Sequence, residues 1–261
     1  MRLGCCARLE QAEIVLAAGF DYLELPVATV RPEEPAAAFA TVAAQIRRWP
    51  LRPEAFNVFL PPSLPVVGPA VDRVAVQRYV QTATERLADL GAAVLVFGSA
   101  GARRRPDDFP PERAWQQLCD FARLAGDEAG RRGITLVIEP ITRRVANTIT
   151  SVQEALALAR AIDHPAVRVL ADLYHMAEDD EPLEVILTAG PWLRHVHVPV
   201  PDLPMLTSTG RVYDHHRFLR LLREAGYTGR ISVEDNGRRF RDLGREAPAV
   251  AQALRAWWAA V

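Results

Sequence analysis

Residues 133–140 read Gly-Ile-Thr-Leu-Val-Ile-Glu-Pro, a short apolar run that begins at a glycine and ends at a carboxylate. A glycine at this point is typical of the end of a preceding helix, because it readily adopts the left-handed backbone that closes the last turn. Longer amphipathic runs lie on both sides of the segment. This alternation is typical of βαβ units and predicts a parallel sheet.

The same pattern occurs eight times along the 261 residues. Eight parallel strands with outer helices in about 250 residues are typical of a TIM barrel, whereas a doubly wound sheet usually has fewer strands and a phosphate loop. No Gly-x-Gly-x-x-Gly follows any run, and no linker interrupts the chain. We therefore predict an α/β fold, a single (β/α)8 TIM barrel domain over residues 1–261. The predicted strands are Arg2–Cys6, Asp21–Pro26, Ala55–Leu60, Ala93–Gly98, Thr135–Pro140, Val167–Asp172, Arg194–Val198 and Arg230–Glu234.

The charge composition excludes several classes of function. The chain has 31 basic and 32 acidic side chains, a formal net charge of -1 and a pI near 6.6. It therefore lacks the broad positive field that a nucleic acid would require. All 31 basic residues are arginine, since the sequence contains no lysine. Schiff-base aldolases, pyridoxal enzymes and P-loop ATPases each need a lysine amine and are excluded.

The cysteine content and the hydropathy pattern bear on the compartment. The three cysteines are an odd number without Cys-x-x-Cys spacing, which argues against a disulfide framework or a thiolate metal site. Charged residues appear early at the N-terminus, and no run of eighteen apolar residues occurs. The sequence thus predicts a cytoplasmic protein that does not bind membranes.

Polar residues end four consecutive predicted strands: Glu139, Asp172, His197 and Glu234. Any one of them alone could be a helix cap or the partner of a neighbouring arginine. Together they surround one mouth of the barrel, where unpaired like charges would repel each other and a divalent cation would resolve the repulsion. This O/N donor set without sulfur predicts one divalent metal ion, Mn²⁺ first, with Mg²⁺, Co²⁺ and Zn²⁺ as alternatives.

The chain resembles the xylose-isomerase-like TIM barrels known as sugar phosphate isomerases/epimerases, which include ketose 3-epimerases and hydroxypyruvate isomerases. Intervals of 33, 25 and 37 residues separate the four strand-end residues, and this spacing is similar to the family's metal quartet. The resemblance implies that Glu139 and Glu234 also act as acid and base, and that His175 contacts a substrate oxygen. The stretches that carry it are residues 18–24, 97–99, 138–144, 172–176, 195–198 and 226–234.

The expected chemistry is proton transfer at a carbon next to a carbonyl. A cation bound to a ketose carbonyl and the adjacent hydroxyl would acidify the C–H between them and stabilise an enediolate. One glutamate could remove the proton and the other could return it. Return to the opposite face gives an epimerase, and return to the neighbouring carbon gives an aldose–ketose isomerase. The sequence leaves both open, and the expected partner is a small keto sugar or polyol-derived compound.

Further residues are weaker candidates. Asn57 on the third strand points to the mouth or to the wall depending on register, and Arg211 could enter the site from the loop after the seventh strand. Three arginines after the fourth strand, at 103–105, could bind a phosphate or carboxylate or form a solvated charge run. His195 should lie one layer below His197 as a core residue.

Two departures from the family pattern keep other functions open. Val145 stands where ketose epimerases have a carboxylate, and the loop after the seventh strand lacks their acidic residue and arginine. The alternatives are a metal-dependent dehydratase of the inosose type and a non-catalytic sugar-binding barrel. A zinc nuclease of the endonuclease IV branch is disfavoured by the six histidines and the charge. By resemblance, the chain could form a homodimer or homotetramer.

Overall fold

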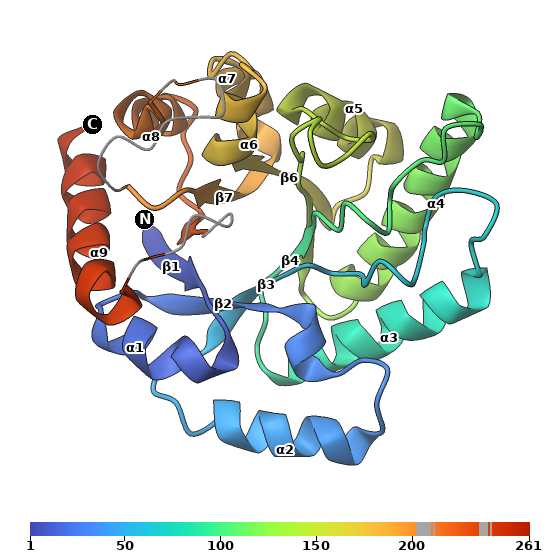
Figure 1. Ribbon diagram of the computed structural model, residues 1–261, viewed down its shortest axis with the longest axis horizontal. Coiled ribbons are helices and arrows are strands. Elements are labelled where there is room, and N and C mark those ends of the chain that lie inside the picture. The colour runs from blue at the N-terminus through green and yellow to red at the C-terminus, as the bar shows by residue number, and fades with distance from the viewer. Residues whose placement is uncertain (202–209, 211, 235–239, 241) are drawn as a thin grey trace.

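The computed structural model describes residues 1–201, 210, 212–234, 240 and 242–261. Eight parallel strands close into a barrel in chain order, from β1 round to β8, which pairs with β1 (Figure 1). The predicted fold class and the number of strands are confirmed. The strands are β1 Arg2–Cys6, β2 Tyr22–Pro26, β3 Pro53–Asn57, β4 Val94–Phe97, β5 Thr135–Ile138, β6 Val167–Asp172, β7 Leu193–Val198 and β8 Arg230–Val233.

Seven strands begin and end within two residues of their predicted limits, and β3 is the exception. The sequence pattern predicted Ala55–Leu60, but the strand ends at Asn57. Val58 has a φ of 48° and leaves the extended conformation there, which a β-branched residue rarely does. The apolar residues that follow, Phe59 and Leu60, are buried in the loop above the strand rather than in it.

Helices surround the barrel in Figure 1 and pack against the outer face of the sheet. Gly91 and Gly133 have φ values of 83° and 72° after the helices that precede β4 and β5, as the sequence predicted for helix ends. None of the helices in the described residues is both long and apolar enough to cross a membrane. The α-helices are α1 Ala12–Ala17, α2 Ala36–Ile46, α3 Arg73–Asp89, α4 Pro111–Gly130, α5 Val152–Ile162, α6 Leu173–Glu178, α7 Val185–Ala189, α8 His215–Glu224 and α9 Leu243–Ala260; 3-10 turns are η1 Leu9–Gln11, η2 Val27–Val30 and η3 Gly190–Trp192.

The apolar core has two parts, one on each face of the sheet. The large part fills the space between strands and helices, and a small cluster lies inside the barrel around Tyr22 and Leu170. Gly4 makes room for the Tyr22 ring, because a Cβ at position 4 would lie 2.3 Å from it. Polar groups of β2, β7 and β8 complete the interior, and they lie directly below the ends of the strands.

Asp21, just before β2, links β1 to the last helix. Its Oδ2 accepts the Leu3 N–H at 2.7 Å, and its Oδ1 accepts from the Arg255 guanidinium of α9 at 2.8 Å. Burial opposes ionisation of this carboxyl, but the Leu3 hydrogen bond and the Arg255 ion pair outweigh it and lower the pKa of Asp21. The contact therefore stabilises the first strand and α9 together.

We expect Asp21→Asn to lower the free energy of unfolding by about 1–3 kcal/mol at neutral pH, the usual effect of losing a charge-assisted hydrogen bond. Because the folded-state pKa is lowered, this stabilisation is present above the unfolded-state pKa of about 4 and is lost as the pH falls through the folded value. Urea unfolding at several pH values measures the difference between variant and wild type, which should shrink on acidification.

Asp89→Asn is the control for this measurement, because it removes the partner of Arg47 between two side chains that are each 47% exposed. It should cost less than about 1 kcal/mol at any pH. A difference between Asp21→Asn and wild type that stayed constant from neutral to acid pH would contradict the role given to the Asp21 carboxylate.

Candidate functional site

The structure brings the four strand-end residues together at the C-terminal mouth of the barrel. One donor atom from each of Glu139, Asp172, His197 and Glu234 lies within 4.8 Å of the donor atoms of the other three. Nδ1 of His197 lies 3.1 Å from Glu139 Oε1 and 3.0 Å from Glu234 Oε2. Asp172 and His197 are fully buried, and Glu234 is the most accessible, with 18% of its side chain exposed.

The backbone around each glutamate explains its position. Glu139 follows β5 and Glu234 follows β8, and each still donates its backbone N–H to the neighbouring strand, to Phe97 O at 3.2 Å and to Val198 O at 2.9 Å. Gly98, after β4, provides the space for the Glu139 carboxylate. A Cβ at Gly98 would lie 2.0 Å from Glu139 Oε2, closer than any real contact.

The other nitrogen of His197 is held from below by Glu24 on β2. Nε2 of His197 donates to Glu24 Oε1 at 2.9 Å, and Nε2 of His195 donates to Glu24 Oε2 at 2.7 Å. Ser232 donates to the same Oε2 at 2.6 Å, and Tyr22 donates to Ser232 at 2.8 Å. The N–H at Nε2 of His197 is thus used in the hydrogen bond to Glu24. Its other nitrogen, Nδ1, faces the carboxylates of the mouth.

The pKa directions follow from this arrangement. Burial opposes the charge of Glu24, but the two histidines outweigh it and hold the pKa of Glu24 well below its usual range. Burial also opposes the charge of His197, whereas Glu24 and Glu234 raise the pKa of His197 well above that of a free imidazole. The pKa of Asp172 is raised, first by burial and further by Glu234. Negative charge at the mouth thus exceeds what the histidine balances.

This donor set fits a divalent cation. Three carboxylates and one imidazole converge on one point, and their atom types suit hard or intermediate cations. Glu234 Oε2 is buried, lies 3.0 Å from His197 Nδ1 and accepts no hydrogen bond of good geometry from the described residues. A buried carboxylate oxygen without a donor, surrounded by other acids, is the environment that a bound cation would neutralise.

His175 lies beside this group, one turn into α6. Its Nδ1 accepts a hydrogen bond from the backbone N–H of Thr142 at 3.3 Å, so the proton of the neutral ring is on Nε2. This Nε2 lies 3.7 Å from Asp172 Oδ2. The residue is 9% exposed. Its predicted contact with a substrate oxygen stays a prediction.

The weaker candidates have different outcomes. Asn57 ends β3 and faces the mouth, where it lines a cavity of about 270 Å³ together with Glu234. Arg211 lies outside the described residues. Arg103 is fully buried, so it is neither a solvated residue nor accessible to a substrate anion. Burial lowers its pKa to about 10, and its charge faces Glu139 and Glu154. Val145 is 53% exposed.

Sequence reasoning missed the role of Glu24 and its partners. His195 is in the core, as predicted, but its hydrogen bond to Glu24 was not foreseen, and its Nδ1 has no partner in the described part of the chain. The available signal was Tyr22-Leu-Glu-Leu-Pro26, in which a lone carboxylate stands in an otherwise apolar strand. A buried carboxylate requires cationic or donor partners, and two histidines on the opposite strand could provide them.

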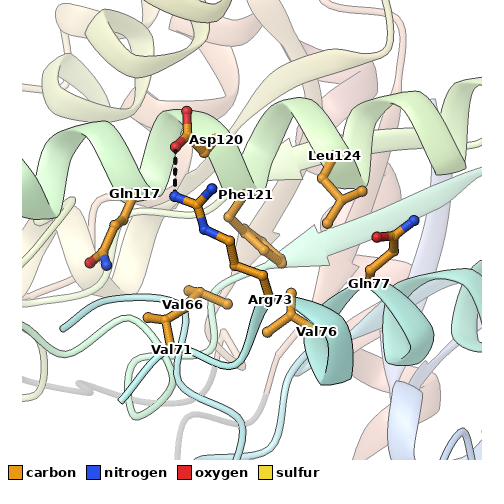
Figure 2. A pocket seen from close by; sticks show the side chains of 9 residues that line it. All are labelled: Val66, Val71, Arg73, Val76, Gln77, Gln117, Asp120, Phe121 and Leu124. Carbon is orange, nitrogen blue, oxygen red and sulfur yellow. Dashed lines mark ion pairs between the residues drawn. The ribbon is translucent and has the colours of Figure 1, made fainter. Parts of the chain in front are cut away.

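A larger cavity of about 380 Å³ lies between α3 and α4, outside the barrel. Figure 2 shows the Arg73 side chain directed toward Asp120 across this cavity, and the two charged groups are 3.7 Å apart. The remaining described side chains that line it are apolar or amide groups, such as Phe121 and Gln117. The cavity therefore lacks the clustered titratable groups of the barrel mouth, which is the candidate site.

The barrel and its mouth define a parallel (β/α)8 protein with a candidate cation centre at the ends of β5 to β8. The chain belongs to the xylose isomerase-like TIM barrel family, whose model matches residues 12–261. It is 30% identical over 84 residues to the D-psicose 3-epimerase of Ruminiclostridium cellulolyticum, which is 32% of this chain and 29% of that protein. It is 25% identical over 178 residues to the 3-dehydro-D-guloside 4-epimerase of Escherichia coli K12, which is 63% of this chain and 67% of that protein.

A solved structure of D-psicose 3-epimerase with D-tagatose, from Clostridium cellulolyticum H10, superposes on 99% of this chain and 99% of that one. The TM-score is 0.78 at 20% sequence identity. The two curated relatives are thus matched over 29% and 67% of their own lengths, and the structural likeness establishes the fold.

We expect Gly98→Ala to displace the Glu139 carboxylate and to lower the affinity for Mn²⁺ by about tenfold or more, because one of the four donors leaves its place. The added Cβ meets the flexible end of a side chain, so the fold should survive. Titration with Mn²⁺ beside circular dichroism checks both parts. Gly244→Ala in α9 is the matched control, since a Cβ there has only ordinary contacts at 3.6 Å and beyond. Equal Mn²⁺ affinity in both variants would rule out this role of Gly98.

We expect Glu24→Gln to lower the Mn²⁺ affinity about 10–100-fold while secondary structure is retained, because the amide no longer sets the orientation of His197. Ser232→Ala removes only a hydroxyl donor to the same carboxylate and should have a smaller effect. Calorimetric titration with Mn²⁺ gives the two affinities. Wild-type affinity in a folded Glu24→Gln protein would show that His197 needs no partner below it.

Proposed function

We propose that this protein is a divalent-metal-dependent epimerase or isomerase of a keto sugar or a related small carbonyl polyol. The observation that supports this most directly is the convergence of Glu139, Asp172, His197 and Glu234 at one point of the mouth. The likeness to a psicose 3-epimerase and a guloside 4-epimerase supports the same reaction class. Mn²⁺ is the ion proposed first, since carboxylates with one imidazole suit it well.

A bound cation would polarise the substrate carbonyl and the adjacent hydroxyl, and so stabilise the negative charge that develops when a proton leaves the carbon between them. Glu139 and Glu234 are the two groups proposed to carry the proton. Their carboxylate oxygens lie 3.1 Å and 3.0 Å from the same His197 nitrogen, and this proximity supports the proposal of two proton acceptors around one position. One takes the proton from the substrate carbon and the other returns it.

Other residues of the mouth are proposed to position the substrate. The Nε2–H of His175 is oriented by the Thr142 N–H on the opposite ring nitrogen, and it can donate to a substrate oxygen. Asn57 has an amide oxygen that can accept a hydrogen bond from a substrate hydroxyl. Arg211, from the loop after β7, is proposed as a further substrate contact.

The test is incubation of the Mn²⁺-loaded protein with keto sugars in D₂O, followed by NMR and mass spectrometry. We expect solvent deuterium at the carbon next to the carbonyl and a product of unchanged composition. Glu139→Gln and Glu234→Gln should each lower the exchange rate by about 10²-fold or more, as removal of a general acid or base does. Loss of one water from the product would instead indicate a dehydratase.

Metal analysis of the same proteins separates binding from catalysis. His197→Asn should lose the one bound ion per chain, whereas His216→Asn, on the exposed face of α8, should retain it. Glu224→Gln is the corresponding control for the glutamates, since Glu224 is a half-exposed partner of Arg220. No ion in the wild-type protein after reloading would refute the proposed enzyme and favour a non-catalytic sugar-binding barrel.

A further inference from the structure

The cavity beside Glu234 is lined by polar side chains that do not belong to the metal quartet. It has a volume of about 270 Å³ and lies at the ends of β1, β3 and β8. Among the described residues that line it, Arg8 is the only cation and Glu234 the only carboxylate, while Phe240 and Leu243 form an apolar wall. The carboxylate of Glu234, a proposed proton-transfer group, and the guanidinium of Arg8 therefore line the same cavity.

Asn57 contributes a buried polar group to the lining of this cavity. The residue is only 5% exposed, and its Oδ1 is buried without a hydrogen-bond partner in the described residues. A buried amide acceptor needs a donor, and a hydroxyl group in the cavity would supply one. The next residue, Val58, has the rarely adopted φ of 48° and ends the strand at this point. Asn57 is thus held at the cavity by the end of β3.

Arg8 is anchored through its backbone and available through its side chain. Its N–H donates to Gln11 Oε1 at 2.9 Å, where η1 begins. The residue is exposed, and no acidic partner of its guanidinium lies in the described part of the chain. Two other arginines that follow strands of the barrel are not available in this way. Arg144 pairs with Glu178 at 2.8 Å, and Arg103 is fully buried.

We propose that the substrate is an acidic keto sugar, whose carboxylate or phosphate pairs with Arg8 while one of its hydroxyls donates to Asn57. This rests on the proposed function, because the reacting carbon must lie next to Glu234. A guanidinium binds either acidic group through two parallel hydrogen bonds. Glu234 repels an anion in the same cavity, so the acidic end is stable only where a cation faces it, at Arg8.

The volume of the cavity limits the size of this substrate. At about 270 Å³ it is smaller than common small-molecule sites of roughly 300–1,000 Å³, which favours one monosaccharide unit over an oligosaccharide. Gln11 lines the same cavity, and because its carbonyl is used by the Arg8 N–H, its NH₂ group is the side that can donate to a ligand. Arg8 and Gln11 thus present donors to an anion, and Asn57 presents an acceptor to a hydroxyl.

Three probes with the same keto-sugar skeleton test the proposal: D-fructose, D-fructuronate and D-fructose 6-phosphate. Their dissociation constants for the Mn²⁺-loaded protein are measured by calorimetry at low and at high salt. We expect at least one acidic probe to bind about tenfold tighter than fructose at low salt, and this preference to fall as salt screens the exposed pair. The preference for one acid over the other identifies the group as carboxylate or phosphate.

Variants of Arg8 show where the anion binds. Arg8→Gln should remove the preference for the acidic probes, and Arg8→Lys should retain part of it as a point charge. Arg48→Gln is the matched control, because Arg48 is an exposed arginine after α2 at the opposite end of the barrel, and it should change none of the three constants. A preference that persists in Arg8→Gln would place the anion on the metal ion and overturn the proposal.

Deuterium exchange with the same probes separates the two hypotheses. Mn²⁺ binding and exchange with fructose, without any preference for the acidic probes, would overturn the acidic substrate and leave the proposed enzyme intact. Absence of both Mn²⁺ binding and exchange would overturn both. Faster exchange with an acidic probe, lost in Arg8→Gln, would support both.

Discussion

The hydrogen bond from His197 to the buried Glu24 is the interaction on which the candidate site depends. An imidazole has two nitrogens, and a hydrogen bond at one of them sets the tautomer and the orientation of the ring, and so which nitrogen faces the mouth. Glu24 supplies this partner from β2, across the barrel interior, and also holds His195. The carboxylate is fully buried, so it is stable only because the histidines and Ser232 surround it with donors.

Burying these charged groups costs free energy, and the surrounding fold contains both the pairing that offsets it and strained backbone at the rim. Charged groups inside the barrel replace apolar packing, and they are tolerated because each carboxylate oxygen of Glu24 is paired. At the rim above them, Val58 and Ser99 have positive φ values after β3 and β4. Backbone strain of this kind is retained where the surrounding structure dictates it and where a site benefits from the resulting side-chain positions. The Ser99 hydroxyl accepts the Leu60 N–H at 2.9 Å and ties the two strained loops together.

The absence of lysine gives arginine several different tasks in this chain. Arg103 is buried, its guanidinium lies over the Phe97 ring, and its charge interacts with that of Glu139. Arg255 ties α9 to the start of β2. Arg8 is exposed at the cavity. Because a guanidinium stays charged even when buried, it can serve in all three environments, whereas a buried lysine would shift its pKa toward neutrality.

Much of the fold could be predicted from the sequence, because strand and helix patterns are local. Eight apolar runs, each followed by an amphipathic one, predicted the closed barrel, and the end of each run was placed within two residues except in β3. The convergence of Glu139, Asp172, His197 and Glu234 also followed, since parallel strands end at one face. By contrast, Val58 ended β3 early through a backbone angle that no apolar pattern encodes.

The sequence by itself thus determined the order of the strands and which polar residues meet at the mouth. Only the tertiary structure decided that Glu24 binds His197, that Asn57 faces a cavity and that Arg103 is buried while Arg8 is not. The physical reason is that these outcomes depend on register and on contacts between residues far apart in the sequence, such as Glu24 and His197 at a separation of 173 positions, which exist only after the barrel closes.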